Sequence, residues 1–437
     1  MNFKSINSHH EMATTATFFR ALSTRVDSWL LRRLYALIGC PQVRILLGDS
    51  IQVSPESTLP IATIVIRDRR SLLKMMLDPQ LGFGEAYTAG HVEVEGSLVD
   101  ALESAFRSMR GREMHTGYVR IVSPLLSFLQ RNSMRGARKN IHRHYDLDTD
   151  FFRLWLDSNL VYSGAYFSCP SLSLEEAQTA KMDHICRKLN LQSGELVVDI
   201  GCGWGALALH MAKHYGVSVQ AVSNSHEQIL WARRRANELA LTHEVEFVED
   251  DYRNIKTRCD AVVSVGMLEH VGPKHYREMG QVLKRILDRG GRGLIQTIGR
   301  NQPLPFNLWT LKHVFPGTYA PTLRQMMDLF EPSDFSIVDI ENLRPHYART
   351  LQHWLERFEK SAARVSERFG PEFVRLWRLY LSGAVAGFRS GSLQHYQIVF
   401  AQPDCHRLPI TRARLDEVEQ TIQTTEIANN RMQSLKC

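Results

Sequence analysis

The sequence predicts an α/β protein with a parallel, doubly wound sheet and a smaller mixed domain before it. Three observations lead to this class. From about residue 170, runs rich in β-branched residues alternate with helical patterns. One run ends in a glycine turn, VVDIGCGWGALAL (197–209), which is typical of a strand that leads into a ligand-binding helix N-terminus. Polar residues follow several of these runs, at the sheet edge where ligands bind in such folds.

Composition narrows the possible classes of protein. A chain of 437 residues can form a large core and two or three structural units. No apolar run approaches the roughly 20 residues that span a bilayer, and the N-terminus lacks a signal-peptide pattern. The 7 scattered cysteines favour reduced thiols in a cytosolic protein. The net charge of +7 suits an anionic partner such as a phospholipid surface.

Residues 1–130 predict the mixed N-terminal domain, which we expect to serve in docking or in homodimer formation. Residues 18–39 have apolar side chains at helical spacing, interspersed with arginines. This helix packs on a core or lies on an anionic membrane, and the sequence does not decide between the two. Strands are predicted within residues 51–55 and 62–68, and a helix over residues 98–109.

Residues 131–170 are expected to form a basic connector and the segment at the entry of the active site. Its positive charges gather at Arg131, Arg135, Arg138, Lys139 and Arg143. Such a run forms a solvated linker or binds phosphate headgroups. Nucleic-acid binding is not expected, because no zinc-finger or RNA-binding motif accompanies the charge.

Residues 171–402 are expected to form the main domain, which contains the doubly wound sheet. Residues 403–437 are expected to form a peripheral polar tail. A capping box of Ser173 and Glu176 begins a helix. The strand-like runs that follow are ELVVDI, VSVQAVS, EVEFVE, DAVVSVG and RGLIQTI. An aromatic-rich insert near residues 300–335 interrupts the pattern.

The residues after these strands indicate which ligand the turn holds. The second strand ends in Val222-Ser223-Asn224-Ser225, without the carboxylate that a dinucleotide site uses for its ribose. Asp250, Asp251 and Tyr252 follow the third strand, where an acid and an aromatic ring can hold an adenine. Glu269 and His270 follow the fourth. S-adenosylmethionine is the ligand favoured by this pattern, and no metal site is expected.

The chain resembles the cyclopropane-fatty-acyl-phospholipid synthase family, which are class I S-adenosylmethionine-dependent methyltransferases. The resemblance runs in family order from about residue 82 to residue 400. It implies methyl transfer to unsaturated acyl chains, with a phospholipid at a membrane surface as partner. The matching stretches are GFGEAYTAGHVEVEG, HYDLDTDFFRLWLDSNLVYSGAYF, VVDIGCGWG, DYRNI, VSVGMLEHVGPKHY, QTIG, VFPG, HYARTLQHWLERF and AGFRSGSLQHYQIVF.

The resemblance also implies roles for individual residues. Together with Asp199 at the end of the first strand, the residues expected to bind the methyl donor are Tyr162, Ser163, Gly201, Gly203, Trp204, Gly205, Ser223, Asn224, Ser225, Gln228, Asp251 and Tyr252. The residues expected to line the acyl chain, including three from the insert, are Tyr166, Phe167, Phe306, Trp309 and Phe315. A long apolar tunnel is what a lipid chain requires.

Two replacements mark the reacting centre that the resemblance implies. Glu269, Ile298 and Tyr347 match three of its positions, where the family holds a bicarbonate ion that serves as base. Gly164 stands in place of a family cysteine, and Gln296 in place of a family histidine. Glutamine cannot carry charge, and glycine leaves room for water or a larger substrate. Bicarbonate is therefore a doubtful cofactor here.

The product therefore remains open at the level of sequence. Loss of a proton from the newly added methyl closes a cyclopropane ring, which we expect as the main product. Loss of a different proton gives a methyl-branched alkene, which the two replacements make the alternative. A lipid-binding protein without catalysis and a methyltransferase acting on a small soluble molecule are the other two classes considered.

Overall fold

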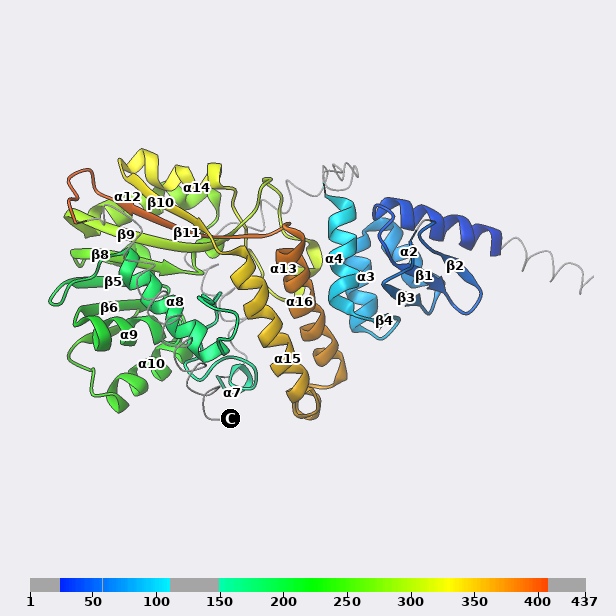
Figure 1. Cartoon of the computed structure of the whole chain (residues 1–437), viewed down its shortest axis with the longest axis horizontal. Helices are drawn as coiled ribbons and strands as arrows, with labels where there is room; N and C mark the ends of the chain where they lie inside the picture. The colour runs from blue at the N-terminus through cyan, green and yellow to red at the C-terminus, as the bar shows by residue number, and fades with distance from the viewer. Residues whose placement is uncertain (1–23, 57, 111–148, 408–437) are drawn as a thin grey trace, which may run out of the picture. The chain divides into compact units, whose positions relative to one another are not determined.

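The structure is a computed structural model that describes residues 24–56, 58–110 and 149–407 (Figure 1). The chain forms two compact units, which are described separately. The first unit consists of Met1–Val119, Asn307–His313 and Ala362–Ser392, and the second of Arg120–Phe306, Val314–Ser361 and Leu393–Cys437. The start of the predicted N-terminal helix, the basic cluster of the connector and the tail after residue 407 lie outside the described residues.

The first unit contains a small mixed sheet and the helices that pack around it. Its strands follow the order β2-β1-β3-β4, with β1 parallel to β3 and antiparallel to β2. Both predicted strands and the predicted helix are confirmed. Besides the helix over residues 24–37, the elements are β1 (Arg44–Leu47), β2 (Ile51–Val53), β3 (Ala62–Ile66), α2 (Arg69–Leu77), α3 (Pro79–Thr88), β4 (Val92–Gly96), α4 (Leu98–Met109), α13 (Leu308–His313) and α16 (Pro371–Ser390).

This division differs from the predicted domain boundaries, because two late segments belong to the first unit. The Arg375 side chain, on α16, donates to the carbonyl oxygens of Tyr87 (2.5 Å) and Val92 (2.7 Å). The Trp309 ring lies so close to Gly84 that a Cβ there would approach its Cδ1 to 2.4 Å. These contacts join residues far apart in the sequence, which local periodicity does not reveal.

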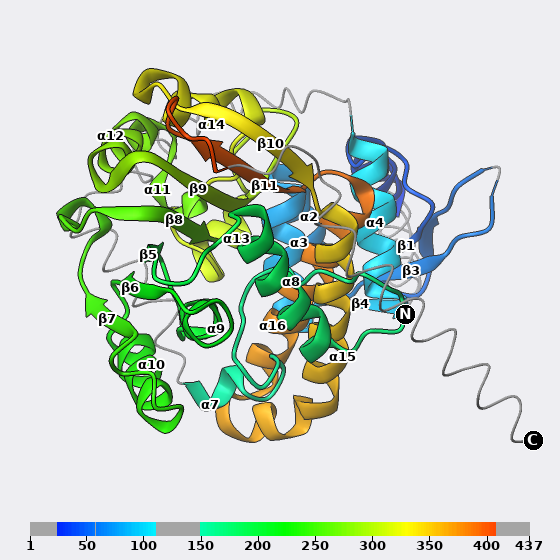
Figure 2. The same cartoon turned by 60° about the vertical axis from the view of Figure 1, so that its left-hand side comes forward.

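The second unit is built on the doubly wound sheet that the sequence predicts. Its strand order is β10-β11-β9-β8-β5-β6-β7, and neighbouring strands from β9 to β7 are parallel (Figure 2). The strands are β5 (Leu196–Ile200), β6 (Ser218–Ser223), β7 (Val245–Glu249), β8 (Cys259–Val265), β9 (Leu287–Gly299), β10 (Ser336–Asn342) and β11 (Gln394–Ala401).

Helices cover both faces of this sheet through two hydrophobic clusters. One cluster joins the sheet to α8 (Leu174–Lys188), α9 (Ala206–Tyr215) and α10 (His226–Glu238). The other joins it to α11 (Leu268–Val271), α12 (Tyr276–Ile286) and α14 (Leu323–Phe330). The predicted capping box is confirmed at α8, where Glu176 N donates to Ser173 Oγ and Ser173 N to Glu176 Oε2. The unit also contains α7 (Thr149–Phe152) and the part of α15 (Arg344–Phe369) up to Ser361.

Strands β11 and β10 extend the parallel sheet, and β11 runs antiparallel to both of its neighbours, β9 and β10. Strand β11 is buried along its whole length. It pairs with β9 so that His395 lies opposite Ile298 and Gln397 opposite Gln296. Directly opposed residues of paired strands share one face of the sheet. The antiparallel edge therefore gathers these four side chains on one face.

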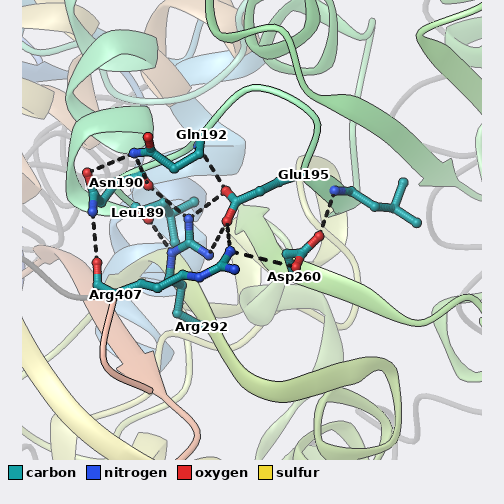
Figure 3. A network of polar contacts seen from close by, with 8 residues as sticks. Leu189, Asn190, Gln192, Glu195, Asp260, Arg292 and Arg407 are labelled. Atoms are coloured by element: carbon teal, nitrogen blue, oxygen red, sulfur yellow. Dashed lines mark hydrogen bonds and ion pairs between the residues drawn. The ribbon is translucent and has the colours of Figure 1, made fainter. Parts of the chain in front are cut away.

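A buried ion pair joins β9 to the loop before β5 (Figure 3). Arg292 is 0% exposed, and its guanidinium donates to both oxygens of Glu195, at 3.1 and 2.7 Å. It also donates to the carbonyl oxygens of Leu189 and of Asn190. Arg407, which follows β11, donates to Glu195 Oε1 at 2.6 Å. One carboxylate thus ties three separate segments of the second unit together.

No helix in the described ranges is long and apolar enough to cross a membrane. The six cysteines in those ranges are all free thiols.

Candidate active site

A cavity lies at the carboxyl ends of β5, β6, β7 and β8, where the sequence places its ligand. Of the residues predicted to bind the donor, all except Gly205 and Ser225 line it. The predicted lining residues are Tyr162, Ser163, Asp199, Gly201, Gly203, Trp204, Ser223, Asn224, Gln228, Asp251 and Tyr252. Other lining residues were not predicted from the sequence, chief among them Lys181, Met267 and Arg253, and His270 was predicted only to follow the fourth strand.

The glycine turn shapes the cavity floor through its backbone. Gly201, Gly203 and Gly205 have φ values of +82°, +56° and +85°, in the left-handed region that favours glycine. Gly205 is the N-cap of α9, and a Cβ there would lie 2.6 Å from Cζ of Phe247. Gly205 therefore does not line the cavity itself but permits the turn whose other residues do.

Gly205→Ala is accordingly expected to destabilise the second unit and to weaken donor binding. Both the left-handed backbone and the Phe247 ring oppose the added methyl, so we expect a loss of about 1–3 kcal/mol in unfolding free energy. Gly194→Ala is the matched control, because Gly194 has a φ of +85° but open space around it. Thermal unfolding of both variants measures the packing contribution, and equal losses would contradict it.

The polar wall of the cavity comes from the end of β6 and the start of α10. Ser223 Oγ accepts from Ser225 N at 3.2 Å and donates to Gln228 Oε1 at 3.4 Å. Ser225 thus supports the wall without lining the cavity. Asn224 Oδ1 is buried and has no hydrogen-bond partner within the described residues. Since buried polar atoms are normally satisfied, this oxygen is free to accept from a ligand hydroxyl.

Asp251 lines the cavity and forms an ion pair with Arg253. Its Oδ1 accepts from Arg253 Nε at 2.7 Å, and its Oδ2 from Arg253 Nη2 at 2.8 Å. Tyr252 is buried and belongs to the same hydrophobic cluster as Ile255 and Met279. This loop can present a ring edge and a paired carboxylate to an adenine.

Two ionisable side chains, those of Lys181 and Asp199, line the same cavity. Lys181 is 1% exposed, donates to Ser163 Oγ at 3.2 Å, and has its pKa lowered by burial to about 8. Burial raises the pKa of Asp199 to about 7, and its Oδ2 has no partner in the described part of the chain. Lys181 lies on the buried face of α8, which the structure shows but the helical spacing of the sequence does not.

Asp199 is expected to make donor binding dependent on pH. A cationic ligand favours the ionised carboxylate, so its binding lowers the Asp199 pKa and releases a proton. Affinity should therefore increase as the pH rises through about 7. Calorimetry in buffers of different ionisation enthalpy measures the released proton. Asp199→Asn should abolish this release, whereas Glu269→Gln should retain it; the reverse result would contradict the assignment.

The residues predicted for the reacting centre gather immediately next to this cavity. Gly164 directly follows Ser163, and Glu269 directly precedes His270, both of which meet the cavity. Glu269 is 6% exposed, and its Oε1 accepts from Ile298 N at 2.6 Å. Its Oε2 has no partner among the residues described. Burial raises the pKa of Glu269 to about 7, so its charge is poised near neutral pH.

Gln296 is held by two neighbours in this centre. Its Oε1 accepts from Gln397 Nε2 at 2.8 Å, and its Nε2 donates to Gly164 O at 3.4 Å. Tyr347, on α15, packs its ring 4.6 Å from that of His395. The structure therefore brings all five predicted positions of the centre together, with His395 as a sixth member that the sequence analysis did not identify.

The expectation of free space at Gly164 is wrong. A Cβ at this position would lie 2.6 Å from His395 Cε1 and 2.9 Å from Tyr347 Cγ. The imidazole of His395 and the Tyr347 ring occupy the volume that a side chain here would need. Gly164 thus makes room for another residue of this chain rather than for water or a larger substrate.

Aromatic rings surround the entrance segment that precedes Gly164. The Tyr162 ring lies 5.5 Å from Phe152, 5.3 Å from Trp155 and 5.3 Å from Trp354, centre to centre. Such ring faces can stabilise a positive charge. Trp155 and Trp354 are each 0% exposed. The cavity therefore borders a continuous aromatic cluster.

Three of the five predicted acyl-lining residues have aromatic or cationic neighbours within the second unit. Tyr166 stacks between His184 (4.2 Å) and His346 (4.8 Å). Phe167 stacks on His353, and Phe306 lies 4.6 Å from the Arg300 guanidinium.

The two other predicted acyl-lining residues, Phe315 and Trp309, lie in different units. Phe315 stands edge-on to His270, which lines the cavity. Trp309 belongs to the first unit, so the predicted tunnel is not assembled from these residues within the second unit alone.

Within the described ranges, no three His, Cys, Asp or Glu side chains are placed to hold a metal ion.

Comparisons with known proteins place this site in a family. The family model described as mycolic acid cyclopropane synthetase matches residues 132–398, and a domain of unknown function matches residues 42–114. A probable fatty acid methyltransferase from Pseudomonas putida is 31% identical over 376 residues, covering 84% of this chain and 93% of its own. Cyclopropane-fatty-acyl-phospholipid synthase from Escherichia coli K12 is 35% identical over 349 residues, covering 78% of this chain and 88% of its own.

A solved structure agrees with these matches. The crystal structure of mycolic acid cyclopropane synthase CmaA1, complexed with SAH and CTAB, matches with a TM-score of 0.58 and 28% sequence identity. It covers 61% of this chain and 98% of its own. SAH is the product that S-adenosylmethionine leaves after methyl transfer. The chain belongs to the mycolic acid cyclopropane synthetase family and is an S-adenosylmethionine-dependent methyltransferase.

Proposed function

We propose that this enzyme methylates the double bond of an unsaturated acyl chain in a phospholipid and closes a cyclopropane ring. The observation that carries the proposal is Glu269, a buried carboxylate with one unpaired oxygen in the group next to the donor cavity. The names of two relatives, a probable fatty acid methyltransferase and a cyclopropane-fatty-acyl-phospholipid synthase, support a lipid substrate.

The chain's own residues suit each requirement of this reaction. Bound S-adenosylmethionine supplies an electron-deficient methyl group; the glycine turn, Asn224 and Asp199 would hold it. An isolated alkene is a weak nucleophile and must be positioned in line with that methyl. Attack leaves a carbocation on the acyl chain. The aromatic cluster around Tyr162 and the Glu269 carboxylate would stabilise this charge away from water.

The alternative product is a methyl-branched acyl chain. Gly164 and Gln296 favour it, because they stand where the family resemblance implies a cysteine and a histidine. If the cation loses a proton from the acyl chain rather than from the new methyl, no ring forms. Ring and branch have the same donor and substrate and differ only in which proton leaves.

We also propose that the first unit contacts the inner face of a membrane. Trp29, on the helix over residues 24–37, is 58% exposed, and the Arg33 guanidinium lies 5.5 Å from its ring. Leu77, on α2, is 76% exposed. The Asp27–Arg69 ion pair (2.8 Å) joins these two helices. Exposed apolar and basic side chains together suit an anionic lipid surface. Homodimer formation through this unit is the second expectation.

The test is mass spectrometry of fatty acids from cells that express the protein and receive methyl-labelled methionine. The proposal expects labelled chains heavier by one methylene group, with a ring identified by chromatography and oxidative cleavage. A labelled branched alkene would establish the alternative product. Labelled small molecules without labelled lipid, or donor binding without any product, would contradict the proposed function.

A further inference from the structure

His395 occupies the centre of the reacting group and is coupled in shape to Gly164. It is 2% exposed and lies opposite Ile298, whose backbone N–H donates to Glu269. Its Cε1 lies 2.6 Å from the place where a Cβ of residue 164 would stand. Any side chain at position 164 would displace this imidazole. The glycine and the histidine therefore form one structural unit.

The imidazole is also chemically available. Its Nδ1 is buried and has no hydrogen-bond partner among the described residues. Such orphaned atoms are rare in buried histidines, because one ring nitrogen normally donates and the other accepts. Burial, reinforced by the positive charges of Lys181 and His346, lowers the pKa of His395 to about 3. The ring is thus neutral at any physiological pH, and one of its nitrogens is free to accept a proton.

The alternative bases nearby are less suited to end the reaction. Gln296 is an amide and takes up no proton at neutral pH. Glu269 has one oxygen anchored to Ile298 N, which fixes the orientation of its carboxylate at the reacting centre. A carboxylate that stays ionised in this site offers more as the counter-charge of a nearby cation.

We propose that His395 is the proton acceptor that ends the reaction, an inference that rests on the proposed function. The alkene electron pair forms a bond to the donor methyl while the carbon–sulfur bond breaks toward sulfur. The carbocation then loses a proton from the new methyl to an unprotonated nitrogen of His395, and the released C–H electron pair closes the ring. The imidazolium returns its proton to water when the product leaves.

A neutral imidazole with a depressed pKa suffices for this step. A carbocation makes the C–H bonds of the methyl group on its neighbouring carbon strongly acidic as the ring closes, so the acceptor does not have to be a strong base. Transfer moves one positive charge from carbon to nitrogen without creating a new one. Ionised Glu269 would then face that imidazolium at the same centre, which favours the transfer in a site of low polarity.

The test compares His395→Asn with the wild type on vesicles of an unsaturated phospholipid and methyl-labelled donor. Asparagine is smaller and keeps hydrogen bonding but is not a base. We expect donor affinity, measured by calorimetry, within about twofold of the wild type, and ring formation reduced by about 100-fold or more. Any residual labelled product should shift from ring to branched alkene. His210→Asn, which removes a buried histidine paired with Asp183, is the control.

A second variant separates a chemical role from a structural one. His395→Ala leaves space for free imidazole, and added imidazole should restore ring formation with a pH profile that follows its neutral form. Ring formation by His395→Asn at the wild-type rate and product ratio would overturn the inference, as would a rescue independent of pH. A wild-type enzyme that binds donor but methylates no lipid would instead overturn the proposed function.

Discussion

Glu269→Gln is expected to abolish methyl transfer to lipid while making the fold more stable at alkaline pH. The carboxylate lies in the reacting group, with Oε1 anchored on Ile298 N and Oε2 unpaired. Glutamine keeps the size but removes the charge that would face a carbocation. We expect kcat to fall by about 100-fold or more. Donor affinity should change little, because Glu269 does not line the donor cavity.

The stability effect follows from the direction of the pKa shift. Burial raises the Glu269 pKa from an ordinary value of 4.5 to about 7 in the folded protein. Folding therefore favours the protonated acid, and this stability is lost as the pH rises through about 7. The ionised group costs about 3 kcal/mol above that pH. Glu269→Gln should remove this loss and raise the unfolding free energy near pH 8 by a few kcal/mol.

Glu278→Gln is the matched control for this experiment. Glu278 lies on the exposed side of α12, where it pairs with His275. Its replacement should leave both activity and the pH dependence of unfolding unchanged. Full activity of Glu269→Gln, or a variant that is less stable than the wild type near pH 8, would contradict the role assigned to this carboxylate.

Arg292→Met is expected to cause the largest loss of stability. It would leave the Glu195 carboxylate with Arg407 and the backbone N–H of Gln192 as its donors, and would remove the guanidinium that donates to the Leu189 carbonyl oxygen (Figure 3). Removal of one partner from a buried ion pair costs about 3–5 kcal/mol, because the other charge stays buried. Chemical denaturation of purified Arg292→Met and of the wild type measures this difference.

Two further variants show that the loss comes from the orphaned charge. Arg289→Met removes an arginine that is 90% exposed and should leave the denaturation midpoint unchanged. The double change Arg292→Met with Glu195→Gln should be less destabilising than the sum of the two single changes, because the two residues interact directly. Additive losses would contradict a coupled pair.

Local patterns in the sequence predicted much of the second unit. The capping box of Ser173 and Glu176, the glycine turn and the β-rich runs each depend on residues close together in the chain, and all appear as expected. The reversed direction of β11 was not predicted. Strand direction depends on long-range pairing, which alternation of apolar residues does not encode.

In the candidate site too, residues that follow local patterns could be predicted, and residues that depend on long-range contacts could not. Residues of the donor cavity could be predicted because they follow strand ends, where the sheet topology brings them together. His395 could not, because its importance depends on the empty volume of Gly164, more than two hundred residues earlier. Lys181 was hidden within an amphipathic helix, where a buried lysine has the same spacing as a core residue.

The most direct measurement is the transfer of labelled methyl groups to vesicles of an unsaturated phospholipid by purified wild-type enzyme and Glu269→Gln. Liquid chromatography and mass spectrometry then identify the acyl chains. The account predicts labelled cyclopropane chains from the wild type and none from the variant, although both bind the donor. Unlabelled lipid after incubation with a folded, donor-bound wild-type enzyme would contradict it.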